Sequence, residues 1–128
     1  FVLGGSEQFD QAGVLWRADA EHWIKAGVEF ADGRLWLGAV VTSGVSDWST
    51  GQVDEWAGRE ITLRLSRAGD AVTVRARCGD EPWRLVRLAP IDPALAWRAG
   101  PFCASPTRAG LSVRFTAWRQ GPADAALH

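Results

Sequence analysis

An Asp-Gly dipeptide, Asp32 and Gly33, constrains the fold of this chain more than any other feature. Alternating apolar residues flank it on both sides, and in that setting Asp-Gly is the strongest short-range signal for a β-hairpin. A two-residue loop at this point sets Val28 against Leu37, and the other pairs on the same face are apolar as well. The turn and the hydrophobic pattern therefore agree on one register, with one face of the hairpin in the core.

Two glycines are expected to meet on the opposite face of this hairpin. The same register places Gly27 against Gly38, and a glycine inside a strand often marks the close approach of another backbone or of a ligand. The preceding stretch extends the pattern and brings Gly13 beside Gly27, provided that residues 18–22 form the connection. We therefore predict a groove that is floored by glycine and shared by three strands.

The rest of the chain repeats short turn signals with alternating apolar residues between them. Alternation is clear over residues 61–66 and again over residues 111–117, so both segments are predicted to be strands. Such a pattern is typical of an all-β sandwich or barrel. A length of 128 residues fits one domain with one core, so we predict a single β-sandwich domain over residues 1–128.

The composition argues against several classes of protein. The chain has 14 Lys and Arg residues and 15 Asp and Glu residues. It therefore lacks the excess of positive charge that is typical of proteins that bind nucleic acid or an anionic membrane. No apolar run approaches the roughly 20 residues that a spanning helix needs. Cys78 and Cys103 could pair with each other, but we expect two reduced and buried thiols, which favours a cytoplasmic location.

Side chains of mixed chemistry are expected around the glycine floor. Indoles offer apolar faces, and charged and amide groups offer directional hydrogen bonds, a combination that suits a carbohydrate. Trp48 lies in the segment SDWST, which we expect to be a loop where the indole plugs the end of the core or forms a binding rim. The candidate ligand-binding residues are Gln11, Arg17, Trp23, Lys25, Glu29, Trp36, Asp47 and Trp48. In the alternative interpretation, Lys25 and Glu29 are ordinary cross-strand partners on a solvated sheet face.

The sequence offers little material for catalysis. A glycosidase needs two carboxyl groups roughly 5 to 9.5 Å apart, yet Glu29 stands alone on its predicted face. A second carboxylate would have to come from Asp47, Asp54 or Glu55. Only two histidines are present, too few for a nucleophilic triad or a His-rich metal site. We therefore predict no catalytic residue, no metal and no cofactor.

Four segments in order carry a resemblance to a known family. They are QAGVLWR (11–17), HWIKAGVEF (22–30), VVTSGVSDWS (40–49) and CASPTRAGLSVRF (103–115). Together they resemble the family of unknown function that includes the fungal regulation-of-enolase protein, whose members have a concanavalin A-like lectin/glucanase fold. The resemblance implies a jelly-roll sandwich of two antiparallel sheets with the glycine-floored face as the concave one. It also implies further strands before residue 11, which we expect this chain to lack.

These observations lead to one functional prediction and two alternatives. We predict an all-β protein whose concave sheet face binds a carbohydrate or a sugar-like metabolite without hydrolysing it. The alternatives are a glycoside hydrolase-like enzyme and a protein-interaction module that regulates a metabolic enzyme. The expected partners are accordingly a carbohydrate ligand or a protein, with neither nucleic acid nor a membrane, and the oligomeric state stays open.

Overall fold

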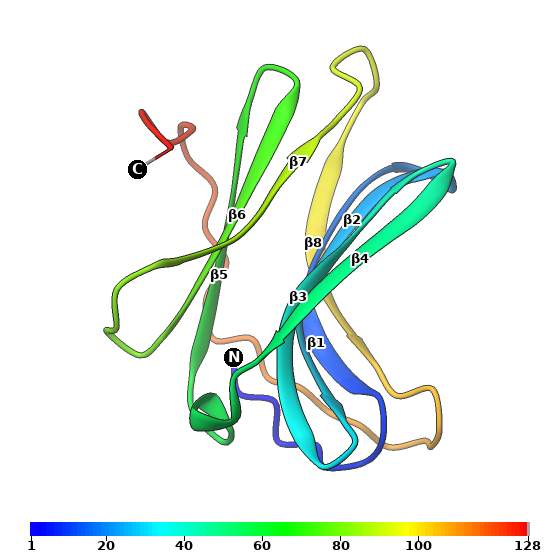
Figure 1. The fold of residues 1–128 in the computed structure, drawn as a ribbon, viewed down its shortest axis with the longest axis vertical. Coiled ribbons are helices and arrows are strands. Elements are labelled where there is room, and N and C mark those ends of the chain that lie inside the picture. The colour runs from blue at the N-terminus through cyan, green and yellow to red at the C-terminus, as the bar shows by residue number, and fades with distance from the viewer. Residues whose placement is uncertain (128) are drawn as a thin grey trace.

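The computed structural model describes residues 1–127 as an all-β chain in which two antiparallel sheets face each other (Figure 1). The larger sheet has the strand order β4-β3-β2-β1-β8, and the smaller sheet has the order β5-β6-β7. The strands are β1 (Asp10–Asp19), β2 (His22–Ala31), β3 (Arg34–Ser43), β4 (Val45–Gln52), β5 (Ile61–Ala68), β6 (Ala71–Cys78), β7 (Arg84–Pro90) and β8 (Arg98–Ala104), with a short 3-10 helix η1 (Asp54–Trp56) before β5. This architecture confirms the predicted β-sandwich of two antiparallel sheets.

The β2–β3 hairpin has the predicted register. Val28 pairs with Leu37, and the two strands are joined by the two-residue turn at Asp32 and Gly33. Both turn residues have positive φ angles, 55° and 74°, which a type I′ turn requires and which Asp and Gly tolerate. The local turn chemistry therefore fixes which face of each strand enters the core.

The predicted row of glycines is confirmed, and it has a packing reason. Gly13 pairs with Gly27 and Gly27 with Gly38, although β1 is longer and its connection to β2 shorter than predicted. A methyl group on Gly27 would lie 2.1 Å from the carbonyl oxygen of Ala12, and one on Gly38 would lie 2.2 Å from that of Ser49. Because the strands approach so closely at this level, no side chain fits between them.

The core lies between the two sheets. Trp56 of η1 is fully buried together with Val28 and Ile61, and a second group of buried residues surrounds Ile24 and Val74. Alternating burial on β5 and β6 confirms the predicted strand over residues 61–66. The strands with apolar alternation, such as β2, β3 and β6, therefore keep one face in the core, as their sequence pattern requires.

The SDWST segment belongs to strand β4, so its predicted assignment to a loop is wrong. β4 pairs with β3 in an unbroken register from Val45 to Gln52. It is an edge strand, and all eight of its residues stay exposed, which explains why the sequence shows no apolar alternation there. Trp48 is 64% exposed and does not plug the core.

The predicted strand over residues 111–117 is also wrong, because the structure assigns no strand after Ala104 within residues 1–127. Leu111, Val113 and Phe115 nevertheless pack against the core with exposed residues between them. The alternation in the sequence reports which side of an extended segment is buried. A strand also needs the backbone of a neighbour at ladder spacing, and no sequence pattern within the segment itself specifies that neighbour.

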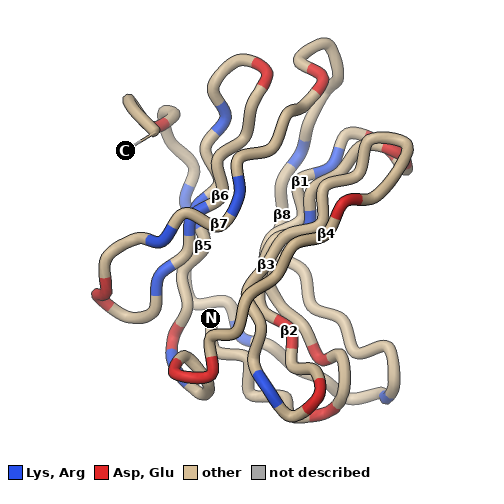
Figure 2. Tube along the Cα trace, in the orientation of Figure 1, with Lys and Arg blue, Asp and Glu red and all other residues tan. Residues whose placement is uncertain are grey.

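Polar contacts attach the C-terminal segment to the smaller sheet. The Asp124 carboxylate forms ion pairs with Arg64 and with Arg75, whose Nη1 lies 2.9 Å from Oδ2, and the Asp124 backbone N–H donates to Ser66 Oγ at 2.8 Å. Basic residues gather on this sheet (blue in Figure 2). The carboxylate therefore neutralises part of a basic surface.

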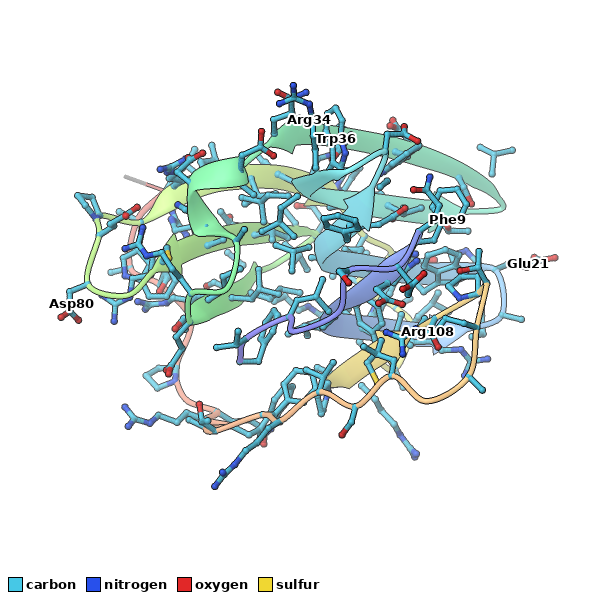
Figure 3. The ribbon with its side chains drawn as sticks, turned by 90° about the horizontal axis from the view of Figure 1, so that it is seen from below. Phe9, Glu21, Arg34, Trp36, Asp80 and Arg108 are labelled. Atoms are coloured by element: carbon cyan, nitrogen blue, oxygen red, sulfur yellow. The ribbon has the colours of Figure 1, made fainter. Side chains whose placement is uncertain are left out.

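A buried ion pair joins the start of β1 to the segment after β8. The Asp10 side chain is 0% exposed and accepts hydrogen bonds from Arg108 Nε at 3.1 Å and Nη2 at 2.5 Å. Figure 3 shows Arg108 on the segment that follows β8. The Glu7 backbone N–H also donates to Asp10, so one carboxylate holds three parts of the chain together.

The two cysteines have different surroundings. Both thiols are free, as predicted, but only Cys78 on β6 is buried. Cys103 is exposed because it lies on β8, an edge strand of the larger sheet, so the prediction of two buried thiols is wrong for it. In the described part of the chain no helix has the length and apolar character needed to cross a membrane.

Candidate functional site

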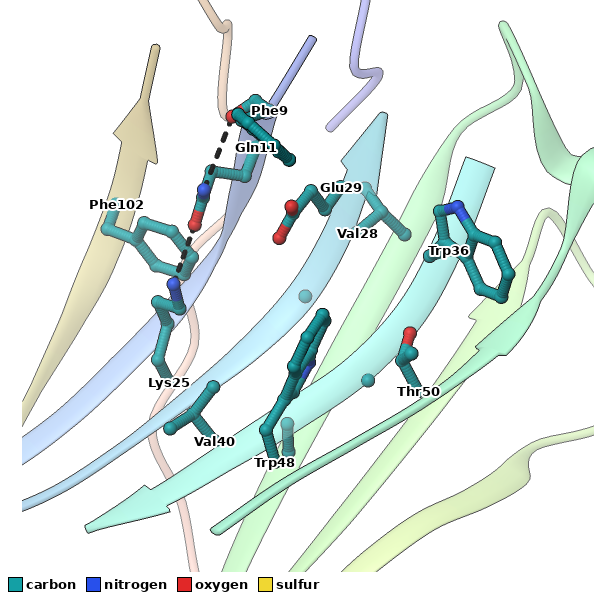
Figure 4. Close-up of a pocket in the computed structure, with 13 residues that line it drawn as sticks. Phe9, Gln11, Lys25, Val28, Glu29, Trp36, Val40, Trp48, Thr50 and Phe102 are labelled. Atoms are coloured by element: carbon teal, nitrogen blue, oxygen red, sulfur yellow. Dashed lines mark hydrogen bonds between the residues drawn. The ribbon is translucent and has the colours of Figure 1, made fainter. Parts of the chain in front are cut away.

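The glycine-floored face of the larger sheet carries a groove of about 360 Å³ (Figure 4). β1, β2, β3, β4 and β8 all contribute to its walls, and Gly27 and Gly38 lie in its floor. Five of the predicted site residues line it: Gln11, Lys25, Glu29, Trp36 and Trp48. The structure therefore brings together most of the candidate residues, because they share one face of four neighbouring strands, β1 to β4.

Three predicted site residues lie outside this groove. Arg17 pairs with Trp23 on the same sheet face, but nearer to the β1–β2 turn and beyond the lining residues. Asp47 lies on the opposite face of β4 and forms an ion pair with Arg87 of β7 at 3.0 Å. Because successive side chains of a strand point to opposite faces, Asp47 and Trp48 cannot both face the groove.

The lining residues that sequence reasoning missed include Phe9, Thr50 and Phe102. Thr50 has the same parity as Trp48 and would have been found if SDWST had been interpreted as a strand. Phe102 lines the groove because β8 pairs with β1. The sequence around Phe102 does not indicate that pairing, because the two strands are far apart along the chain. Phe9 precedes β1 with a positive φ of 68°, which a sequence pattern does not reveal for phenylalanine.

Lys25 is held on the β1 and β8 side of the groove. Its Nζ donates to Gln11 Oε1 at 2.7 Å, and Gln11 Nε2 donates in turn to the Phe9 carbonyl oxygen at 3.2 Å (Figure 4). The ammonium also lies 5.9 Å from the centre of the Phe102 ring. Lys25 is thus a cross-strand partner of Gln11 on β1 and is not hydrogen-bonded to Glu29, which lies on the same strand, β2.

The Glu29 carboxylate has neither a hydrogen bond nor an ion pair with the residues that the structure describes, and it points into the groove (Figure 4). Burial raises the pKa of this carboxyl above its ordinary value, and the positive charge of Lys25 opposes that shift. The indole of Trp36 is fixed by a hydrogen bond from Nε1 to the Ala31 carbonyl oxygen at 3.0 Å, and that of Trp48 is largely exposed. The groove thus combines an unpaired acceptor with aromatic walls.

Glu29 is the one carboxylate among the described residues that line the groove. Asp54 and Glu55, the remaining candidates for a second carboxylate, are engaged outside it by Arg34 and Arg84 at 2.6 and 3.1 Å. A glycosidase mechanism with two converging carboxylates therefore has no second group here. Residues 1–127 also contain no cluster of three His, Cys, Asp or Glu side chains arranged to hold a metal ion.

Comparison with known proteins identifies relatives in yeast. "Regulation of enolase protein 1" of Saccharomyces cerevisiae is 39% identical over 129 residues, a match that covers 99% of this chain and 65% of the yeast protein. A crystal structure described as that of a functionally unknown protein from Saccharomyces cerevisiae superimposes with a TM-score of 0.75 at 36% identity, over 82% of this chain and 56% of that one.

The family comparison agrees with these relatives and with the resemblance carried by the four sequence segments. Residues 1–123 match the family described as "Protein of unknown function (DUF1349)". The match extends over both sheets and includes every residue that lines the groove. The chain therefore belongs to the DUF1349 family of proteins of unknown function.

Proposed function

We propose that this protein is a non-catalytic binding module that holds a carbohydrate or a sugar-like metabolite in the groove. The observation that carries the proposal is the Glu29 carboxylate, which has no partner among the described residues and lies in a groove with aromatic walls. A grooved sheet face on a β-sandwich is also compatible with the lectin/glucanase fold that the family resemblance implies. A cytoplasmic location, favoured by the free thiols, forms part of this proposal.

The groove offers the two kinds of contact that a sugar ring needs. The indoles of Trp36 and Trp48 provide apolar area for the C–H face of a ring. Glu29 accepts hydrogen bonds from ring hydroxyls, while Lys25 and Gln11 provide further polar groups on the other wall. Because Lys25 and Gln11 are already bonded to each other, little side-chain freedom is lost when a ligand binds.

The test is a titration of the full chain with monosaccharides and oligosaccharides, in which binding is measured by calorimetry and by tryptophan fluorescence. We expect saturable binding that weakens at least about tenfold in Glu29→Ala and Trp48→Ala, since each change removes a central contact. Trp118→Ala is the matched control, because Trp118 is 46% exposed but lies outside the groove. Absence of binding to every sugar, or equal binding by Trp48→Ala and the control, would contradict the proposal.

A protein-interaction role is the second candidate, and the open edge of β4 favours it. Among residues 1–127 no strand pairs with the outer side of β4, whose eight residues are exposed and include neither Lys nor Pro to block the addition of a strand. The yeast relative is named for the regulation of enolase, so enolase is the partner to test first. Purified enolase should bind the chain with an affinity that Ser46→Pro lowers and Glu29→Ala leaves unchanged.

A further inference from the structure

We infer that the groove selects a sugar that carries a free ammonium group over a neutral sugar of the same ring. This inference rests on the proposed function and specifies the charge of its ligand. It follows from the charges that line the groove, from the aromatic side chains around Glu29 and from the desolvation of its carboxylate.

The charges in the groove are separated rather than paired. Lys25 is the one cationic side chain among the described lining residues, and its ammonium is bonded to Gln11 and lies over Phe102. Glu29 is the one carboxylate, and no described residue donates a hydrogen bond to it. A half-buried anion that no described residue meets with a hydrogen bond or an ion pair is complementary to a cationic ligand.

The aromatic walls favour the same ligand chemistry. Trp36 and Trp48 line the β3–β4 side of the groove and Phe102 the β8 side, so Glu29 lies between aromatic side chains (Figure 4). A ligand cation is attracted to the face of an aromatic ring, most strongly to that of tryptophan. An ammonium placed at Glu29 would therefore gain an ion pair and a cation–π contact together, whereas a hydroxyl would gain one hydrogen bond.

Desolvation adds to this preference. Burial in the groove raises the pKa of Glu29, which means that the ionised form lacks the solvation it has in water. A cationic donor compensates an ionised carboxylate better than a neutral donor does, because an ammonium adds the attraction between two full charges to the hydrogen bond. The remainder of the sugar ring still provides the apolar face that packs on an indole.

The test compares three β-1,4-linked trisaccharides that differ only at carbon 2, built from glucose, from glucosamine and from N-acetylglucosamine. Calorimetry is performed on the full chain near pH 6, where the primary amines of the glucosamine units are largely protonated. We expect the glucosamine trisaccharide to bind at least about tenfold more tightly than the other two. Higher salt should narrow this difference, because screening weakens an ion pair at an open groove.

Two variants locate the effect. Glu29→Gln should abolish the preference for the glucosamine trisaccharide while binding of the glucose trisaccharide changes much less. Glu21→Gln removes the same charge at an exposed residue outside the groove and should retain the preference.

The outcomes separate this inference from the proposed function. Equal affinity for the three trisaccharides would overturn the inference and leave sugar binding in place. Binding of none of them would overturn both, and a preference that survives in Glu29→Gln would place the selective contact outside Glu29 and overturn the inference.

Discussion

Glu29 is expected to lower the stability of the free protein at neutral pH. Because its pKa is raised by burial, the folded state binds the proton more tightly than the unfolded chain does, and stability falls as the pH rises through the raised pKa. Glu29→Gln should therefore raise the free energy of unfolding at pH 7, by less than about 1 kcal/mol because solvent screens a half-buried group. The gain should vanish below the ordinary pKa of about 4.3. Urea denaturation of the parent and of Glu29→Gln at pH 7 and below the ordinary pKa measures both differences. A variant less stable than the parent at pH 7 would contradict the prediction.

Gly27 is expected to tolerate no side chain. A methyl group there would lie 2.1 Å from the Ala12 carbonyl oxygen and 2.8 Å from the Gly13 Cα, so the strands would have to move apart. Gly27→Ala should lower the free energy of unfolding by more than about 2 kcal/mol. Gly51→Ala is the control, since nothing lies within 4 Å of its added methyl, and it should change stability by less than about 0.5 kcal/mol. Similar effects of the two changes in thermal denaturation would argue against the close approach.

At the level of single elements, β4 shows where sequence analysis succeeds and fails. The β2–β3 register could be predicted because the turn residues and the apolar pattern specify the same pairing. β4 could not, because an edge strand with both faces exposed has no apolar alternation to reveal it. The same mistake placed Asp47 in the site and left out Thr50, because the alternation of side chains was applied only to recognised strands.

The C-terminal segment that follows β8 is expected to depend on Asp124 for its attachment to the smaller sheet. Asp124→Asn removes the ion pairs with Arg64 and Arg75 and leaves the mostly buried Arg75 without that counter-ion. Amide hydrogen exchange over residues 120–127 should accelerate at least about tenfold, and the free energy of unfolding should fall by about 1–2 kcal/mol. Asp80→Asn, an exposed turn residue, should change neither quantity. Unchanged exchange in this segment would show that the Asp124 contacts do not hold it.

For the whole molecule, the Asp10–Arg108 pair predicts how acid unfolds the protein. The hydrogen bond from Arg108 holds the pKa of Asp10 below its ordinary value although burial opposes the shift. This contribution to stability is present above about pH 4 and is lost as the pH falls through the lowered pKa. Asp10→Asn should be less stable than the parent at pH 7, and its urea midpoint should decline less steeply in acid. Asp70→Asn, an exposed turn substitution, should follow the parent curve; parallel curves for Asp10→Asn would contradict the prediction.

The larger sheet also has an order in which it can be assembled. β1, β2 and β3 each pair with the next strand along the chain, whereas β8 reaches β1 from near the other end. Contacts between distant segments form late, because closing a long loop has an unfavourable entropy. Phe102 and its wall of the groove belong to that last strand. During synthesis the first four strands can therefore fold as they leave the ribosome, but the groove is complete only after β8 has emerged and joined them.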